Sequence, residues 1–341
     1  MKQQGGSKQP ADYDRKTDTL KFEIFVQRGF SELELASVTT TLQAANKIRA
    51  DRLFEWQFVS DEPGLVKGSS GVLVRAVPSI PDHALADWMI VLGSDNPKTN
   101  TWLKRARTMQ RHGLPTILLS GAATAYIKAT KITDGAITTH WRDAAFLHET
   151  GYYPRLTSRF SEKSGGIITS AGLGSTSELL IGIIAEFMAP HEIAELGSYL
   201  LIHTIRGSTT EQPKHISDNT NLFDRRISLA VSLMENAIEE PLSIQELTRK
   251  IGLSARQLER SFNVVFEMSP GRFYRKLRIK HARVLLEQTQ MCLADVASAT
   301  GFASTSTLSK AFRDVYNESP NEMRMRNKIQ LLDYCVDNSL V

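Results

Sequence analysis

Cysteine is scarce in this sequence, since Cys292 and Cys335 are the only two among 341 residues. So few thiols argue against a disulfide framework, and we expect both to be buried or unused. Uninterrupted apolar runs are also missing, and none approaches the roughly 18 residues of a membrane-spanning helix. The polar residues 1–18 lack the apolar centre of a signal peptide. These absences predict a cytoplasmic protein with no membrane partner and a disordered tail at residues 1–19.

The material that is present suffices for more than one domain. A length of 341 residues with 41% hydrophobic residues predicts two or three domains with full cores. A polar stretch at residues 206–221 is the expected linker between a first domain at 20–205 and a second at 222–330, with a C-terminal tail at 331–341. The second domain carries 17 lysines and arginines against 12 acidic residues. This basic balance favours a nucleic-acid partner for that part of the chain.

One pattern occurs twice in the second domain. Residues 244–270 return as residues 293–320, at an offset of 49 residues up to the glycine of each copy and 50 after it. In each copy a short apolar-faced segment ends at Gly252 or Gly301, where a left-handed residue stops a helix, and a second segment with helical spacing follows. Each copy is therefore predicted to be a helix-turn-helix, and the amphipathic residues 271–288 a helix that joins them.

The second helix of each copy carries polar residues on the face opposite its apolar residues. In a helix-turn-helix this helix enters the major groove, where an arginine that reads guanine contributes about 1–3 kcal/mol of discrimination. Glu259 either accepts a hydrogen bond from a cytosine amine or orients Arg256 or Arg260. The candidates for contact with bases or phosphates are Ser254, Arg256, Gln257, Glu259, Arg260, Arg272, Ser304, Thr305, Ser306, Ser309, Lys310 and Arg313.

The second copy contains Ala294-Asp295-Val296-Ala297, Gly301-Phe302, Ser309-Lys310 and Ser319-Pro320. With these motifs, residues 222–326 resemble the DNA-binding domain of the AraC/XylS family of transcriptional regulators. The resemblance implies promoter DNA as the partner, with two recognition helices in adjacent turns of the major groove. It further implies a nucleoid-associated homodimer that pairs through its first domain, and it leaves contact with RNA polymerase open.

The first domain alternates apolar segments rich in valine, isoleucine and leucine with amphipathic segments. This order predicts an α/β domain, a parallel sheet covered by helices on both faces, followed by an all-α second domain with two helix-turn-helix motifs. The strands are expected at residues 20–26, 54–60, 72–77, 88–92, 115–120 and 166–169. The helices are expected at residues 32–50, 101–111, 126–130, 142–150, 175–188 and 192–205.

Ligands bind such sheets where the carboxyl ends of the strands meet. Trp141 offers a ring face to a cation, with Glu34 or Asp95 supplying negative charge. Each candidate also has a structural alternative: His140 and Trp141 as core residues, Asp95 as a helix cap and Glu34 as a solvated acid. The candidates for the walls of an effector pocket are Glu34, Ser94, Asp95, Asn96, Ser120, Gly121, His140, Trp141 and Ser170.

Three motifs, 118–122, 138–141 and 169–172 (LLSGA, TTHW and TSAG), make residues 22–205 resemble the class I glutamine amidotransferase-like fold, in the version fused to AraC-type regulators. Enzymes of this fold place a cysteine on a sharp strand-to-helix turn, and the resemblance aligns that position with Leu119. A leucine has no nucleophilic atom, so we expect no catalytic residue, no cofactor and no enzyme. The resemblance implies small nitrogenous effectors: quaternary amines such as carnitine or betaines, or amino acids.

These observations predict a ligand-responsive transcriptional regulator, expected to be an activator. The main alternative is a hydrolase or amidotransferase fused to a DNA-binding module, with Ser120 as the nucleophile in a register slipped by one residue and His140 as its base. A metal site is not indicated, because His112, His140 and His148 lie on separate segments without ligand-like spacing. The third hypothesis for the function is an architectural DNA-binding protein with no effector.

Overall fold

The computed structural model describes residues 19–49, 53–80, 84–94, 101–130, 135–151, 153–213, 216 and 224–326. The chain folds into two units, with the boundary after Gln212. The first unit also excludes residues 145–152, which group with the second. The predicted linker at 206–221 thus begins inside the first unit. The predicted tails lie outside the described residues.

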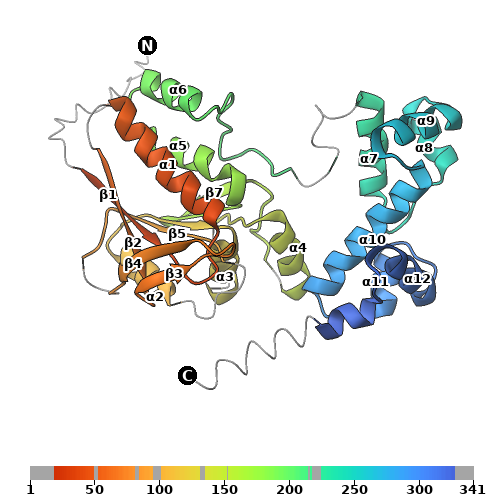
Figure 1. Cartoon of the computed structure of the whole chain (residues 1–341), viewed down its shortest axis with the longest axis horizontal. Helices are drawn as coiled ribbons and strands as arrows, with labels where there is room; N and C mark the ends of the chain where they lie inside the picture. The colour runs from red at the N-terminus through yellow and green to blue at the C-terminus, as the bar shows by residue number, and fades with distance from the viewer. Residues whose placement is uncertain are drawn as a thin grey trace, which may run out of the picture. The chain divides into compact units, whose positions relative to one another are not determined.

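The first unit is built on one eight-stranded sheet (Figure 1). Its strand order is β3-β4-β2-β1-β5-β6-β8-β7, and every pair is parallel except the two outermost pairs, β3 with β4 and β7 with β8. The predicted parallel sheet is therefore correct for its centre, while the short antiparallel edge strands were not predicted. The strands are β1 (Leu20–Phe25), β2 (Phe54–Ser60), β3 (Gly64–Lys67), β4 (Leu73–Pro78), β5 (Trp88–Val91), β6 (Thr116–Leu119), β7 (Ser161–Ser164) and β8 (Ile167–Ser170).

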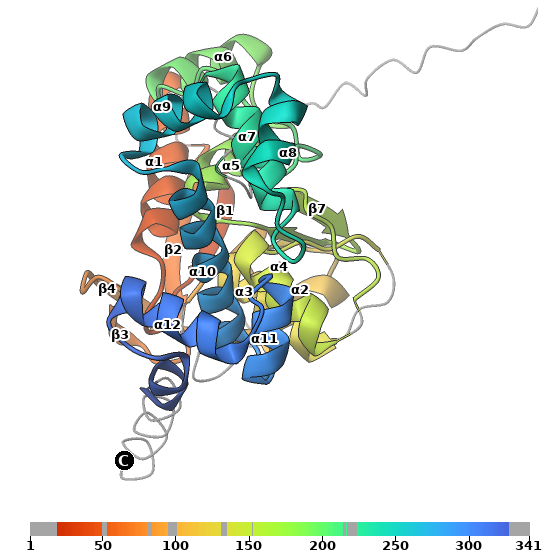
Figure 2. The same ribbon diagram turned by 90° about the vertical axis from the view of Figure 1, so that its right-hand side faces the viewer.

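Helices cover both faces of this sheet (Figures 1 and 2). Successive strand residues alternate between two hydrophobic clusters: Ile24 and Ile90 lie in one, and Phe25 and Val91 in the other. The first cluster includes residues of α1 (Glu32–Arg49), α5 (Thr176–Ile184) and α6 (Pro190–Tyr199). The second includes residues of α2 (Trp102–Arg111) and α3 (Ser120–Thr130). Near-continuous apolar strands are what a sheet buried on both faces requires.

Two further helical segments occur in this part of the chain, and the residues of the longer one from Ala145 on group with the second unit. The short helix η1 (Leu173–Ser175) follows β8, and α4 (Trp141–Thr150) follows the residues after α3. Residues 136–139 form only an isolated bridge, between Ile137 and Leu156. Helix α3 begins at Ser120, six residues earlier than predicted, because its buried alanines favour a helix as strongly as the residues after them.

The second unit is all-helical, and its two halves repeat (Figure 1). Its helices are α7 (Arg225–Asn236), α8 (Ile244–Ile251), α9 (Ala255–Phe266), α10 (Pro270–Gln288), α11 (Leu293–Ala299) and α12 (Thr305–Tyr316). Gly252 and Gly301 are left-handed, with φ of +68° and +66°, as the repeat predicted. Glu267 and Asn317, which end α9 and α12, are left-handed as well. The predicted double helix-turn-helix is present.

Each half has a hydrophobic core of its own, and α10 is the helix that the two cores share. Phe273 and Tyr274, near its start, lie in the cluster of the first half. Ile279, Ala282 and Leu285, further along, lie in the cluster of the second half. Figures 1 and 2 show α10 running from one helix pair to the other. One continuous helix therefore sets the distance and the rotation between the two halves.

The two glycine turns have different surroundings. A Cβ atom built on Gly301 would lie 2.6 Å from Pro241 Cγ and 2.7 Å from the Ile238 carbonyl oxygen, whereas one built on Gly252 would meet no atom within 4 Å. Arg278 of α10 also donates hydrogen bonds to the carbonyl oxygens of Thr300, at 2.8 Å, and of Gly301, at 2.6 Å. The second turn is thus packed between α10 and the loop after α7.

Within the described residues, no helix combines the length and apolar character that a bilayer crossing demands.

Candidate effector pocket and nucleic-acid interface

Helix α9 divides its residues cleanly between core and solvent. Leu258 and Phe262 are completely buried, while Arg256, Glu259 and Arg260 are exposed. Among the described residues none of these three charged side chains has an ion pair or hydrogen bond, so the idea that Glu259 orients an arginine has no contact to support it. Ser254 and Gln257 instead form the capping box of α9: Ser254 Oγ accepts from the Gln257 amide at 3.2 Å, and Gln257 Oε1 accepts from the Ser254 amide at 2.9 Å.

Helix α12 repeats this arrangement with polar residues in place of the charged ones. Leu308 and Phe312 are buried, and Ser304 caps the helix by accepting from the Thr307 amide at 3.2 Å. Ser309 is half-buried. The remaining predicted contact residues of this helix, Thr305, Ser306, Lys310 and Arg313, are exposed. Most of the predicted contact residues of the two helices are thus exposed, while three of them, Ser254, Gln257 and Ser304, are engaged in helix capping.

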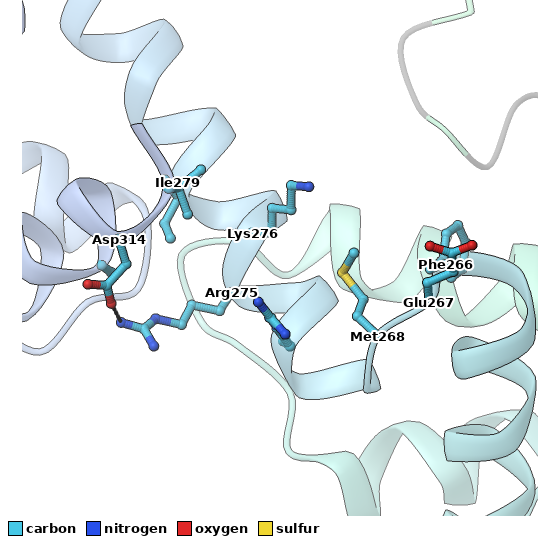
Figure 3. A pocket seen from close by; sticks show the side chains of 10 residues that line it. Phe266, Glu267, Met268, Arg275, Lys276, Ile279 and Asp314 are labelled. Carbon is cyan, nitrogen blue, oxygen red and sulfur yellow. Dashed lines mark hydrogen bonds and ion pairs between the residues drawn. The ribbon is translucent and has the colours of Figure 1, made fainter. Parts of the chain in front are cut away.

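A basic groove of about 530 Å³ lies between the ends of α9 and α12 and the start of α10 (Figure 3). Arg272, Arg275 and Lys276 line it from α10. Arg275 Nη2 lies 3.3 Å from Asp314 Oδ2 of α12, and this exposed pair joins the two halves. Arg272 and Lys276 add positive charge to this groove, and Arg272, the predicted phosphate contact, lies near the C-terminal ends of α9 and α12.

In the first unit, the sharp turn at the end of β6 is formed by Ser120. Leu119 is the last residue of the strand, is completely buried and packs in the cluster beneath α1 and α5. Ser120 has a φ of +36°, which is strained for a residue with a side chain. The prediction that Leu119 occupies the turn is therefore corrected by one residue. The cause is that Leu119 still pairs with Ser170 of β8 as the last residue of β6, so its side chain alternates into the core and the turn follows at Ser120.

Glu34 lies beside this turn. It is completely buried, so it is not the solvated acid that its place in the first turn of α1 also allowed. Its Oε2 accepts a hydrogen bond from the Gly93 amide at 2.7 Å, and its Oε1 accepts one from the Leu173 amide at 3.0 Å. Three segments distant in the sequence, α1, the end of β5 and η1, thus meet at one carboxylate.

Two glycines allow the serine and the carboxylate to approach. A Cβ atom on Gly93 would lie 1.9 Å from Ser120 Oγ and 3.2 Å from Glu34 Oε2. A Cβ atom on Gly172 would lie 2.1 Å from Glu34 Oε1 and 3.0 Å from Ser120 Cβ. Any larger residue at 93 or 172 would therefore displace one of the two polar side chains. Neither glycine was among the predicted pocket residues, although both follow apolar strands.

The other predicted pocket residues near the turn differ in their roles. Ser94 is nearly buried, and its Oγ donates to the Arg28 carbonyl oxygen at 3.0 Å. Gly121 packs against Ser94, whose carbonyl oxygen would lie 2.7 Å from an added Cβ. Ser170 is completely buried, and its Oγ donates to the Phe160 carbonyl oxygen at 3.0 Å and accepts from the Gly172 amide at 3.2 Å. Ser170 therefore supports the turn from inside the fold. The predicted residues Asp95 and Asn96 lie outside the described residues.

His140 and Trp141 are half-buried neighbours whose ring centroids lie 5.6 Å apart. Desolvation lowers the pKa of His140, and the positive charge of Arg142 acts in the same direction while Asp143 opposes it. The Arg142 guanidinium carbon lies 5.3 Å from the centroid of a Trp141 ring. The chain therefore already supplies one cation to this indole.

Thr139 links this loop to the elbow formed by Ser120. Its Oγ1 donates to the Ser120 carbonyl oxygen at 3.1 Å and lies 2.6 Å from the hydroxyl oxygen of Thr124. On the other side of the loop, the Trp141 amide donates to Gln212 Oε1 at 2.9 Å. Sequence reasoning missed Thr139 and Gln212 because an isolated polar residue carries no spacing signal. No group of three or more potential metal ligands lies together in the part of the chain that is described.

The comparisons with known proteins agree on one class. A family model described as a helix-turn-helix domain matches residues 247–326. The HTH-type transcriptional regulator CdhR of Pseudomonas aeruginosa is 28% identical over 308 residues, which cover 89% of this chain and 91% of that protein. The regulatory protein SoxS of Salmonella typhimurium is 30% identical over 100 residues, 29% of this chain and 94% of SoxS.

Among similar solved structures is a transcriptional regulator from Chromobacterium violaceum, described as an AraC-type DNA-binding domain-containing protein. It is 39% identical and matches over 30% of this chain and 91% of that chain, with a TM-score of 0.29. The similarity to CdhR extends through both units, because the 308 matched residues are more than either unit contains.

Proposed function

Because the chain belongs to the AraC/XylS family of DNA-binding transcriptional regulators, we propose that its first domain binds a small effector that controls promoter binding. The observation that carries the proposal is the polar site at the elbow, where Glu34 and Ser120 meet between Gly93 and Gly172. It lies where parallel sheets of this kind bind ligands, beyond the carboxyl ends of the strands.

The proposed effector is a small nitrogenous metabolite, a quaternary amine or an amino acid. A buried carboxylate, Glu34, and a half-buried indole, Trp141, are the groups that attract an ammonium ion. Since Arg142 already lies over the Trp141 ring, the effector must take the other ring face or displace the guanidinium. Ser94, Gly121 and the elbow hydroxyl would line the same pocket, with Asp95 and Asn96 as further candidates.

The test is a thermal-shift screen of the full-length protein against amino acids, carnitine and betaines. A ligand that binds only the folded state raises the melting temperature, by about 2.7 kcal/mol of stabilisation at a hundredfold excess over its Kd. Trp141→Ala should abolish the shift, whereas Trp56→Ala, a half-buried tryptophan of β2 outside the site, should preserve it. A shift that survives Trp141→Ala would remove the indole from the site, and no shift with any compound would refute this effector class.

We further propose that the first domain is no enzyme, although Ser120 on a strained turn favours a serine hydrolase as the second candidate. A serine nucleophile needs a base within hydrogen-bond reach. Among the described residues, no histidine is hydrogen-bonded to Ser120 Oγ. Incubation with a fluorophosphonate probe separates the two readings by intact-protein mass spectrometry. We expect no adduct, and a covalent adduct that disappears in Ser120→Ala would establish the hydrolase instead.

For the second domain, we propose that the exposed faces of α9 and α12 contact the bases and that Arg272 contacts a phosphate. Homodimerisation through the first domain and activation of transcription complete the proposal, with RNA polymerase as a possible contact of the bound regulator. Light scattering on the purified chain tests the dimer. A reporter fused to a promoter fragment selected by binding tests the sign of regulation, which should be an increase in transcription.

A further inference from the structure

The segment after α6 does not leave the first unit as a free linker. Arg206 pairs with Glu178 of α5, with Nε 2.8 Å from Oε2 and Nη2 2.5 Å from Oε1. Its guanidinium carbon also lies 5.4 Å from the centroid of the Phe160 ring. Further along, the Thr210 carbonyl oxygen accepts from the Phe160 backbone N–H at 3.0 Å, and the Gln212 backbone N–H donates to the Ser158 carbonyl oxygen at 2.9 Å. Residues 206–212 are therefore held along the first unit up to its last residue.

Gln212 ends this docked segment with a buried side chain. Only 6% of the residue is exposed. Its Nε2 donates to the carbonyl oxygens of Thr139, at 2.8 Å, and Arg159, at 3.0 Å, and lies 3.2 Å from Thr138 Oγ1. Its Oε1 accepts from the Trp141 amide at 2.9 Å. The side-chain amide is thus satisfied on both sides, and removing it would take the acceptor from the Trp141 backbone N–H and one donor each from the carbonyl oxygens of Thr139 and Arg159.

These bonds place Gln212 two hydrogen bonds away from the elbow. The backbone of Thr139 is bonded to Gln212, and the hydroxyl of the same threonine is bonded to the Ser120 carbonyl oxygen. The amide that follows His140 is bonded to Gln212 as well. A displacement of Trp141 must therefore either carry Gln212 with it or break their bond, and a displacement of Ser120 acts on Gln212 through Thr139. Beyond Gln212 the chain continues directly into the second unit.

We propose that Gln212 is a positioning residue that couples the state of the elbow site to the release of the linker. This inference rests on the proposed effector site, whose walls include Ser120 and Trp141. Two states differ in the bonds of one side chain: docked, with Gln212 inserted, and undocked, with the segment at 206–212 freed from the first unit. An effector that binds one state more tightly shifts the balance and so changes the length of chain that tethers the DNA-binding domain.

The test uses hydrogen–deuterium exchange of the full-length chain without any ligand. Gln212→Met keeps the length of the side chain and removes its amide. Thr139→Val removes the hydroxyl that bonds Ser120 and Thr124 and leaves every bond of the Gln212 side chain in place, because that side chain bonds only the backbone carbonyl oxygen of Thr139 and otherwise Thr138, Arg159 and Trp141. Gln57→Ala, at an exposed position on β2, is the control for a glutamine lost elsewhere.

Coupling is reciprocal, so each variant should affect the segment at the other end of the path. We expect Gln212→Met to speed exchange at residues 119–124 about tenfold, and Thr139→Val to speed exchange at residues 206–213 by a similar factor, which corresponds to about 1.4 kcal/mol. Gln57→Ala should change neither segment. If Gln212→Met loosens only 206–213 and 138–142, or Thr139→Val only the elbow, Gln212 is an anchor without coupling and the proposal is wrong.

The outcome is independent of the effector screen. Reciprocal exchange effects without any thermal shift would support the coupling and count against the effector class. A thermal shift without reciprocal exchange effects would support the effector site and refute the role of Gln212. Tryptophan fluorescence before the exchange experiment confirms that each variant is folded, since the tryptophans at 56, 88, 102 and 141 all belong to the first unit.

Discussion

The two turn glycines of the repeat allow a matched prediction, because the same substitution meets different surroundings. Gly252→Ala and Gly301→Ala both place a Cβ atom on a left-handed residue, which costs about 1–2 kcal/mol. The loss of a flexible glycine in the unfolded chain offsets about 0.4–1 kcal/mol of that in each case. Gly252→Ala adds nothing further, because no atom lies within 4 Å of the new Cβ. Its expected net cost is about 1 kcal/mol.

Gly301→Ala carries a second penalty. The new Cβ would lie 2.6 Å from the Pro241 ring and 2.7 Å from the Ile238 carbonyl oxygen, and neither is the free end of a flexible side chain. The loop must therefore move, and overpacking of this kind costs about 1–3 kcal/mol. The total of about 3 kcal/mol corresponds to a loss of about 15 °C in the melting temperature of a domain of this size, against about 5 °C for Gly252→Ala.

Differential scanning calorimetry of the full-length chain measures both losses. The tryptophans at 56, 88, 102 and 141 all lie in the first unit, so their fluorescence reports that unit separately and should show an unchanged transition. The melting temperature assigned to the second unit should fall about three times further in Gly301→Ala than in Gly252→Ala. Equal losses in the two variants would refute the close packing of the second turn. A larger loss in Gly252→Ala would contradict the whole argument.

Three further outcomes are expected. Arg105→Ala should lower the free energy of unfolding, measured by chemical denaturation, by about 3–5 kcal/mol. The substitution leaves the completely buried carboxylate of Glu23 without its ion-pair partner. Glu32 should stabilise the turn after β3 only above acidic pH. Burial opposes ionisation of its carboxyl group, but hydrogen bonds from Ser69 and Ser70 lower its pKa to about 2. The stability advantage of the unsubstituted chain over Glu32→Gln should therefore be present above about pH 4.5 and vanish as the pH falls towards 2. In gel-shift titrations Arg256→Ala should weaken binding to a selected promoter fragment by about 1–3 kcal/mol and relax its sequence preference, while Arg226→Ala on α7 should preserve both.

The double helix-turn-helix was predictable because its signals are local. A glycine after a short amphipathic segment, a serine cap and a Ser-Pro pair each act within one or two turns of chain, and the repeat presents them twice. The structure places Gly252 and Gly301 in the expected conformation. In the sheet, the central strands were equally evident, since burial on both faces leaves long apolar runs. The edge strands β3 and β7 are four residues each and half exposed, so they show no such run.

The elbow and the docked segment required three-dimensional information. Whether Leu119 or Ser120 forms the turn depends on where β6 stops pairing with β8, a difference of one residue that reverses which side chain enters the core. Gln212 lies in a polar stretch whose composition is typical of a linker. Its side chain is held by the carbonyl oxygens of Thr139 and Arg159 and by the backbone N–H of Trp141, and a single sequence holds no record of that convergence.

The shared helix α10 has a consequence for how this DNA-binding domain can change during evolution. Substitutions on its exposed side leave the geometry of the two halves unaltered, because Phe273 and Leu285 hold the opposite side in two separate cores. An insertion or deletion is different. One additional residue would turn the second half by about 100° relative to the first and advance it by about 1.5 Å. The number of residues in α10 is therefore under far stricter constraint than their identity. The spacing between the two DNA segments that the helix-turn-helix motifs contact can change only as far as DNA bending allows.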